Sequence, residues 1–355
     1  MDGEFELGHF PAHPAALIST WLSENTGQPV AAFRWEPIGT GQVADSVRIW
    51  LDHGEGRETT LAAKFSAADA TSRGTAAMFG LYTNEVHFYR EAASRLDVRT
   101  PETYFAGVSE DGADCCLLFE DMGPARQGDQ VAGCTIEDAR AAIRQAAAIH
   151  GPSWQRSELL DAPWLAPRAA FADALIPLYV HAQTEFRERY ADALEPELMD
   201  VCEGFAELAP RWFKRDFARQ AIVHGDFRLD NMLFDIRGGA EPIAILDWQT
   251  VAASDPLMDV GYFLGCGIGD GLRVAHETEL LALYRGEMAK YGAFFQESDF
   301  HKRYRIGALH GVATAVFSAA HVERTERGDA NFLSMARGAC SLARAVDSLE
   351  ALAEE

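Results

Sequence analysis

The stretch that decides the fold reads IVHGDFRLDNMLF at residues 222–234, followed after a Gly-Gly turn by IAILDW at residues 243–248. Short apolar runs on either side of such a turn predict a β-hairpin. The hairpin would bring Asp226, Asn231 and Asp247 to one edge of its sheet. Carboxylate and amide oxygens suit Mg²⁺, which completes its shell with water and phosphate oxygens. The stretch therefore predicts a magnesium site, with one carboxylate left to act as a base toward a hydroxyl.

The order of these residues resembles the catalytic loop of the protein-kinase superfamily. An Asp is followed after four residues by an Asn and, beyond an apolar strand, by a second Asp. The forms His-Gly-Asp and Asp-Trp are similar to those of the aminoglycoside phosphotransferase and choline kinase branch. The sequences HGDFRLDN and ILDW are most similar to the corresponding motifs of ecdysteroid-kinase-like proteins and of the phosphotransferase domains associated with acyl-CoA dehydrogenases. The alternative is a His-Gly-Asp turn that only joins two strands.

The resemblance implies an α+β, protein-kinase-like fold with two lobes. Residues 1–121 would form a small N-lobe that binds the nucleotide, with five antiparallel strands and one main helix. Residues 122–355 would form a larger, mostly helical C-lobe with the catalytic loop, the metal site and the substrate-binding helices. The N-lobe strands are expected at 30–38, 47–51, 59–65, 98–106 and 115–119, with a helix at 84–93. Further helices are expected at 13–27, 135–150, 169–193, 195–216 and over most of 274–352. Thr135 and Asp138 can cap the second of these, and Pro177 and Pro210 could kink or split the next two.

Two features of the N-lobe bear on the phosphates of a nucleotide. Gly39-Thr-Gly41 lies between two predicted strands, where backbone amides could approach phosphates, although a plain hairpin turn is an equal alternative. Lys64 ends the third strand, and the resemblance implies that it holds the α- and β-phosphates. A helical glutamate would position this lysine; Glu85 is the favoured partner and Glu91 is its rival.

The residues that follow the fifth strand are expected to form the hinge between the lobes. The pattern breaks at Glu-Asp-Met-Gly-Pro, residues 120–124. The resemblance implies that backbone groups near Glu120 and Met122 bind the adenine edge. An ordinary turn has the same composition, so this interpretation depends on its place in the chain.

The resemblance implies an ATP- and Mg²⁺-dependent transfer of the γ-phosphate to a hydroxyl of a small molecule. Asp226 would orient the hydroxyl and accept its proton, while Asn231 and Asp247 would bind Mg²⁺. His224 would steady the loop, and Arg228 would contact the γ-phosphate or an anionic group of the substrate. The short segment after Asp247 favours a small molecule over a peptide. Aminoglycosides, choline-like alcohols, steroids and hydroxyacyl-CoA all remain possible acceptors.

Two other functions are compatible with the motif. One is a non-catalytic, nucleotide-binding pseudokinase, which the presence of Lys64, Asp226, Asn231 and Asp247 disfavours. The other is a metal-dependent hydrolase that uses Asp226, Asp247 and His224, although such sites usually have more ligands at short spacing.

Several residues outside the motif are given structural roles. Asp255-Pro256 fits the start of a helix, and Asp259 is interpreted as structural. His150 is interpreted as a packed or capping histidine and His310 as packed or solvated. The Gly-rich segment 261–272 is interpreted as a helix break rather than a substrate loop. A scatter of basic residues is interpreted as a solvated face, with a CoA phosphate as the alternative ligand: Lys302, Arg303, Arg305, Arg324 and Arg327.

Bulk composition limits the partners. The 355 residues carry a formal charge of −23, which argues against nucleic acid, because phosphate backbones need basic surface. Six cysteines without a Cys-x-x-Cys pair suggest reduced thiols and a cytoplasmic protein. The sequence predicts neither a signal peptide nor a membrane helix, and it leaves the oligomeric state open.

Overall fold

The computed structural model describes residues 10–39, 44–165, 171–215, 220–321 and 324–355. The chain forms two compact units. The first comprises Met1–Ser94, Thr100–Pro124 and Asp247–Thr250, and the second comprises Arg95–Arg99, Ala125–Leu246 and Val251–Glu355. Together the small antiparallel sheet and the mostly helical remainder confirm the predicted α+β class.

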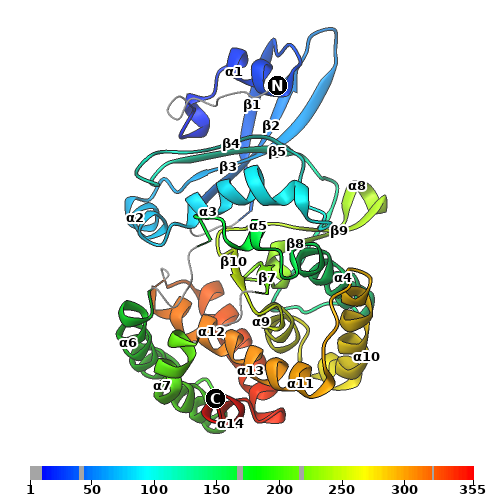
Figure 1. Cartoon of the computed structure of the whole chain (residues 1–355). Helices are drawn as coiled ribbons and strands as arrows, with labels where there is room; N and C mark the ends of the chain where they lie inside the picture. The colour runs from blue at the N-terminus through cyan, green and yellow to red at the C-terminus, as the bar shows by residue number, and fades with distance from the viewer. Residues whose placement is uncertain (1–9, 40–43, 166–170, 216–219, 322–323) are drawn as a thin grey trace. The chain divides into compact units, whose positions relative to one another are not determined.

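The first unit is built on a five-stranded antiparallel sheet with the order β1-β2-β3-β5-β4 (Figure 1). Its strands are β1 (Ala32–Pro37), β2 (Ala44–Asp52), β3 (Glu58–Ser66), β4 (Thr103–Val108) and β5 (Cys115–Glu120). All five were predicted, but β4 begins at Thr103 rather than at 98. Pro101 lacks the N–H that a ladder needs, and the Arg99 carbonyl accepts from Ile245 in the second unit instead.

Alternation along β3 sets the two faces of this sheet. Leu61, Ala63 and Phe65 point into a core that also contains Val47 and Leu22. Lys64 therefore points to the opposite face. The packing of Tyr89 on Phe119, with ring centroids 4.8 Å apart, places the chain after β3 on that opposite face. The apolar alternation of the strand is thus what directs the lysine toward the helix.

The helices of the first unit depart from the sequence prediction at their ends. The predicted helix 13–27 begins only at Ser19, as α1 (Ser19–Thr26), because Pro14–Ala16 form a separate 3₁₀ turn and the next two residues are extended. Helix α2 (Ala70–Met78) was not predicted, since ATSRGTAAM has few apolar residues at helical spacing. Helix α3 (Leu81–His87) begins before the predicted position 84 and continues as a wider π-helical turn, Phe88–Ala92, and a 3₁₀ turn, Ala93–Arg95.

The second unit contains the predicted hairpin. Strand β8 (Met232–Asp235) pairs antiparallel with β9 (Glu241–Ile245), and β8 also pairs with β6 (Arg126–Gln127). The connection is a tight turn, labelled α8 (Ile236–Gly239), in which Arg237 and Gly238 have left-handed φ angles of 53° and 70°. Residues 222–223 lie in β7 (Ala221–Val223), which pairs with β10 (Ala252–Ser254) and not with the hairpin.

Helices make up most of the second unit (Figure 1). They are α4 (Ile136–Ser153), α5 (Ser157–Leu160), α6 (Ala172–Tyr190), α7 (Pro196–Lys214), α9 (Leu257–Tyr262), α10 (Asp270–Ala289), α11 (Glu297–Gly307), α12 (Leu309–His321), α13 (Glu326–Ala345) and α14 (Ser348–Ala353). A large apolar core joins α6, α7, α9, α12 and α13. Thr135 and Asp138 form the expected capping box of α4.

Prolines shape these helices less than the sequence suggests. Helix α4 continues past the predicted end at 150 and includes Pro152. Pro177 lies within α6 and Pro210 within α7, and neither splits its helix. Buried residues of the large core lie close to two of these prolines: Tyr179 near Pro177, and Ala209 and Trp212 near Pro210.

Two further interpretations are tested by the second unit. Arg303 is not part of a solvated face: it is buried and binds both oxygens of Asp255, at 2.7 and 2.8 Å. Asp255 also accepts the backbone N–H of Leu257 at 2.9 Å, as expected at the start of α9. The Gly-rich segment 261–272 contains a helix break, as interpreted. Helix α9 continues into a π-helical turn, Phe263–Gly267, and the helical backbone then stops at Gly269, which has φ 75° and precedes α10. Among the described helices, none is both long and apolar enough to cross a membrane.

Candidate active site

In the first unit, Lys64 lies between two carboxylates. Its Nζ is 2.7 Å from Oε2 of Glu85 and 2.9 Å from Oδ1 of Asp247. Glu85 is the expected partner; the rival, Glu91, binds His87 instead at 2.6 Å. Burial opposes the charge of the ammonium, but the two carboxylates outweigh burial and raise the pKa of Lys64 above its ordinary value. Lys64 therefore stays a cation throughout the physiological range.

The segment that carries Asp247 is fixed against α3 and the turn that follows it. Trp248 is fully buried and stacks on Phe88, with ring centroids 3.7 Å apart and planes 7° apart. Asn84 donates from its side chain to the carbonyl of Gln249 at 3.4 Å. Asp247 itself has φ 63°, a conformation that is uncommon outside glycine and asparagine. Such strain persists only where surrounding contacts impose it, and it is found disproportionately at functional sites.

The residues expected at the hinge form hydrogen bonds with other residues of the first unit, and the sequence did not predict these bonds. The backbone N–H of Glu120 donates to the Glu102 carbonyl at 2.9 Å, and its side chain accepts the Glu102 N–H at 2.8 Å. Asp121 binds Arg48 through two hydrogen bonds, of 2.7 and 3.1 Å. The Glu120 N–H is therefore used within the protein, while Met122 is buried just beyond it.

The glycines expected near the phosphates are only partly covered by the structure. Gly39 has φ 76°, a left-handed conformation that favours glycine, and it follows β1 closely. Gly41 lies outside the described residues.

In the second unit, the backbone of the His-Gly-Asp turn is held by a buried carboxylate. The N–H groups of His224 and Gly225 donate to Asp259 at 2.6 and 2.9 Å. Asp259 also contacts Nε2 of His150 at 3.1 Å, and Nδ1 of His150 contacts the Tyr284 hydroxyl at 2.9 Å. Burial opposes ionisation, but these hydrogen bonds and the nearby histidines lower the pKa of Asp259. The structural role expected of Asp259 is thus to anchor the turn.

His224 braces the loop from within. Its Nε2 is 2.8 Å from the Leu246 carbonyl, and its Nδ1 accepts the backbone N–H of Asp226 at 3.2 Å. On the other side, His310 of α12 places Nε2 2.7 Å from the Gly225 carbonyl. Both histidines therefore position backbone, and neither is arranged as a catalytic base in the structure.

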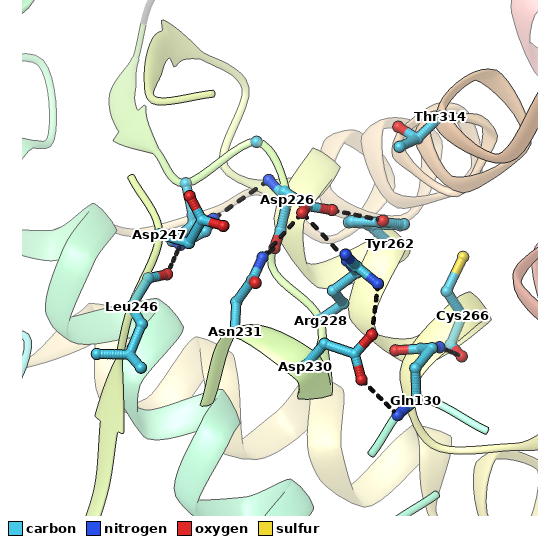
Figure 2. A network of polar contacts seen from close by, with 12 residues as sticks. Gln130, Asp226, Arg228, Asp230, Asn231, Leu246, Asp247, Tyr262, Cys266 and Thr314 are labelled. Atoms are coloured by element: carbon cyan, nitrogen blue, oxygen red, sulfur yellow. Dashed lines mark hydrogen bonds and ion pairs between the residues drawn. The ribbon is translucent and has the colours of Figure 1, made fainter. Parts of the chain in front are cut away.

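Three side chains converge on the Asp226 carboxylate (Figure 2). The Tyr262 hydroxyl donates to Oδ1 at 2.7 Å, while Nε of Arg228 and Nδ2 of Asn231 donate to Oδ2 at 3.1 and 2.8 Å. Burial alone would raise the pKa of Asp226, but the Arg228 guanidinium and the Tyr262 hydroxyl lower it to about 2. Asp226 is therefore an oriented, fully ionised carboxylate at neutral pH.

Arg228 is shared between two carboxylates. Beside its bond to Asp226, its Nη1 donates to Oδ2 of Asp230 at 2.7 Å. Oδ1 of Asp230 accepts the backbone N–H of Gln130 at 2.9 Å, and the Gln127 side chain donates to the Asp230 carbonyl at 2.6 Å. Gln130 in turn donates to the Cys266 carbonyl. These bonds, drawn in part in Figure 2, connect the catalytic loop to the segment after β6.

Sequence reasoning missed Tyr262, His310 and Asp230. One signal was available for Tyr262: it lies three residues after Asp259, so the two side chains share a face of one helix. No comparable spacing connects His310 to the loop, since 85 residues separate it from Gly225.

Comparisons with known proteins identify the family of the chain. The model of the ecdysteroid kinase-like family matches residues 46–293. Mouse (Mus musculus) acyl-CoA dehydrogenase family member 10 is 34% identical over 84 residues, which are 24% of this chain and 8% of that protein. The chicken (Gallus gallus) family member 11 is 30% identical over 86 residues, which are 24% of this chain and 11% of that protein. The matched stretch is therefore a small part of both relatives.

Solved structures share the fold at low sequence identity. The GDP complex of aminoglycoside 2'-phosphotransferase-IIIa is 17% identical with a TM-score of 0.50, covering 94% of this chain and 96% of that one. A Ralstonia eutropha protein assigned as an aminoglycoside phosphotransferase is 15% identical with a TM-score of 0.52, covering 92% of this chain and 97% of that one. These likenesses establish a kinase-like fold, and the family model covers well over half of the sequence. The chain belongs to the ecdysteroid kinase-like family.

Proposed function

We propose that the protein transfers the γ-phosphate of ATP to a hydroxyl of a small molecule in a Mg²⁺-dependent reaction. Residues 1–121 serve as the nucleotide-binding lobe and residues 122–355 as the catalytic lobe. The observation that carries the proposal is the pairing of Lys64 with both Glu85 and Asp247. A buried cation between two carboxylates is a costly arrangement for stability alone, whereas it positions a lysine for phosphates.

The residues assigned to Mg²⁺ fit that ion. Asn231 uses Nδ2 on Asp226, which turns its Oδ1 away from that carboxylate and leaves it as an oxygen ligand (Figure 2). Asp247 keeps 41% of its side chain exposed. Leu246, the residue before Asp247, donates its N–H to the Asn231 carbonyl at 2.8 Å. Mg²⁺ needs few protein ligands, and when bound it would offset charge on the phosphate oxygens.

Asp226 acts on the acceptor. In the transfer, the bond from the γ-phosphorus to the bridging oxygen breaks, a bond to the acceptor oxygen forms, and the hydroxyl proton passes to Asp226. A carboxylate with a pKa of about 2 is a weak base, but phosphoryl transfer has a loose transition state that mainly requires orientation and charge compensation. Asp226 thus orients the hydroxyl and receives its proton late.

The remaining polar groups prepare these partners. Arg228 compensates the charge of Asp226 and would contact the γ-phosphate or an anionic group of the substrate, while His224 holds the backbone of the loop. Glu85 fixes Lys64 toward the α- and β-phosphates. Backbone groups near Glu120 and Met122, and the turn that contains Gly39 and Gly41, would complete the nucleotide site. The GDP bound to the similar aminoglycoside phosphotransferase supports a nucleotide site in this fold.

Two variants test this assignment. Asp226→Asn should lower kcat by at least about 100-fold with little change in nucleotide affinity, because it removes the carboxylate that orients the hydroxyl and accepts its proton. Asp247→Ala should abolish Mg²⁺-dependent ATP binding in calorimetry. Asp173→Ala serves as the control, because it removes an exposed carboxylate that pairs with Lys214 and has no assigned role. Wild-type turnover in Asp226→Asn would exclude the role given to that residue.

The acceptor is found with a panel. ADP release is measured with Mg·ATP and Mg·GTP against an aminoglycoside, a choline-like alcohol, a steroid and a hydroxyacyl-CoA. One class should stimulate release well above the rate without acceptor. Nucleotide binding without any turnover across a broad panel would favour the pseudokinase alternative.

A further inference from the structure

Tyr262 has a buried hydroxyl that the mechanism above does not use. It ends α9, is fully buried, and donates to Oδ1 of Asp226 at 2.7 Å. Burial and the neighbouring Asp226 carboxylate raise the pKa of Tyr262 well above its ordinary value, so the phenol keeps its proton. Tyr262 is therefore a permanent donor to the carboxylate that is assigned to the acceptor.

The hydrogen bonds of Asp226 leave one direction open. An ionised carboxylate has about four lone-pair positions, two on each oxygen. Oδ2 accepts from Arg228 and from Asn231, which fills both of its positions. Among the described residues of its own unit, Oδ1 accepts from Tyr262 alone. The position that remains lies on Oδ1, beside the Tyr262 hydroxyl.

We propose that Tyr262 is a positioning residue that turns the Asp226 carboxylate and directs the acceptor hydroxyl to the remaining lone pair of Oδ1. This inference rests on the proposed function, in which Asp226 receives the hydroxyl proton. It adds a specific geometry: the acceptor oxygen and the phenol oxygen share one carboxylate oxygen.

The packing around Tyr262 makes it a rigid support. Its ring lies edge-on to His310, with centroids 5.3 Å apart, and His310 binds the Gly225 carbonyl. At Gly261, the preceding residue, a Cβ would lie 2.6 Å from the Ala308 backbone nitrogen, so α9 packs directly against the junction between α11 and α12. Asp259, on the same helix, holds the backbone of the loop. One short helix thus fixes both the loop backbone and the carboxylate that the loop carries.

The test compares Tyr262→Phe with Tyr190→Phe. The first removes the hydroxyl and keeps the ring. The control removes another buried tyrosine hydroxyl that donates to a carboxylate, Asp329, at 2.6 Å. Each variant is assayed with Mg·ATP and the panel compound of highest kcat/KM, and ADP release is compared with phosphorylated acceptor. Thermal unfolding and the KM for ATP are measured in parallel.

Tyr262→Phe should lower kcat by about 10- to 100-fold, the effect of one hydrogen bond to a charged group. The KM for ATP should stay within about twofold, and more ATP should be hydrolysed per acceptor phosphorylated, because water needs no directed approach. Tyr190→Phe should change none of these quantities.

If Tyr262→Phe unfolds, 4-fluorophenylalanine at position 262 replaces it, because this residue keeps the ring and a substituent in the place of the hydroxyl but has no donor. Lost coupling of ATP use to acceptor phosphorylation in the folded variant supports the proposal, and retained wild-type kcat and coupling overturn it. Wild-type kcat and coupling in a folded Tyr262→Phe also overturn it, as do equal losses of acceptor transfer and ATP hydrolysis. If Asp226→Asn itself turns over normally, the proposed function fails first. If Asp226→Asn loses turnover but Tyr262→Phe keeps wild-type kcat and coupling, the proposed function stands and this inference alone is wrong.

Discussion

Replacing Arg228 by glutamine should destabilise the protein in a way that depends on pH. Arg228 is the main group that lowers the pKa of Asp226 against the effect of burial. The shift, from 3.8 to about 2, corresponds to about 2 kcal/mol between the two protonation states. Both side chains are about one-fifth exposed, so solvent screens the pair only in part. Arg228→Gln should therefore cost about 2 kcal/mol of unfolding free energy at neutral pH.

The sign of the pH dependence follows from the lowered pKa. The folded protein holds Asp226 ionised where the unfolded chain would already bind a proton. The stabilisation is therefore complete above pH about 4 and is lost as the pH falls toward about 2. The difference between wild type and Arg228→Gln should be constant from pH 7 to about pH 5 and should narrow below about pH 4.

Urea unfolding followed by circular dichroism over this range measures the difference. A double-mutant cycle with Asp226→Asn separates the Asp226 pair from the bond that Arg228 makes to Asp230. Arg337→Gln, at an exposed pair with Glu195, is the control and should cost little. A loss in Arg228→Gln that is independent of pH, or no loss at all, would refute the electrostatic account of this residue.

Two further predictions concern the nucleotide side of the protein. Lys64→Ala should raise the KM for ATP at least about tenfold, because it removes the cation between Glu85 and Asp247; steady-state kinetics checks this, and an unchanged KM would contradict the phosphate role. Trp248→Ala should cost about 3–5 kcal/mol in urea unfolding, because it empties the buried stack on Phe88, and it should weaken Mg·ATP binding by releasing the Asp247 segment. Trp248→Phe keeps a ring in the stack, so it should lose much less unfolding free energy and much less Mg·ATP affinity than Trp248→Ala. Equal losses in the two variants would contradict the role given to the stack.

Local patterns in the sequence predicted the parts of the fold that depend on neighbouring residues. The β8–β9 hairpin follows from two apolar runs and a glycine turn, and the strands of the first sheet follow from alternation. The order of motifs identified Glu85 as the partner of Lys64, and the structure confirms that pair. The hairpin and the strands depend on neighbouring residues. The Lys64–Glu85 pair follows from the order of motifs in the families that the sequence resembles.

Contacts between distant segments were not predictable in the same way. Tyr262 lies 36 residues from Asp226, and nothing in that spacing shows that its hydroxyl meets the carboxylate. In the sequence nothing distinguishes Arg303 from a surface arginine. In the structure it is buried, and its Nε and Nη2 donate to the carboxylate of Asp255, 48 residues earlier. Pro177 and Pro210 suggested helix breaks, which tertiary packing overrides. Contacts between segments that are distant in the sequence determine these three features.

The central claim is that Lys64, Asn231 and Asp247 bind one Mg·nucleotide, with Asp226 facing its terminal phosphate. A crystal structure with Mg²⁺ and a non-hydrolysable ATP analogue measures this directly. The account predicts a metal bound by Oδ1 of Asn231 and the carboxylate of Asp247, with Nζ of Lys64 at the α- and β-phosphates. A metal held by other residues, or a nucleotide bound away from all four side chains, would contradict it.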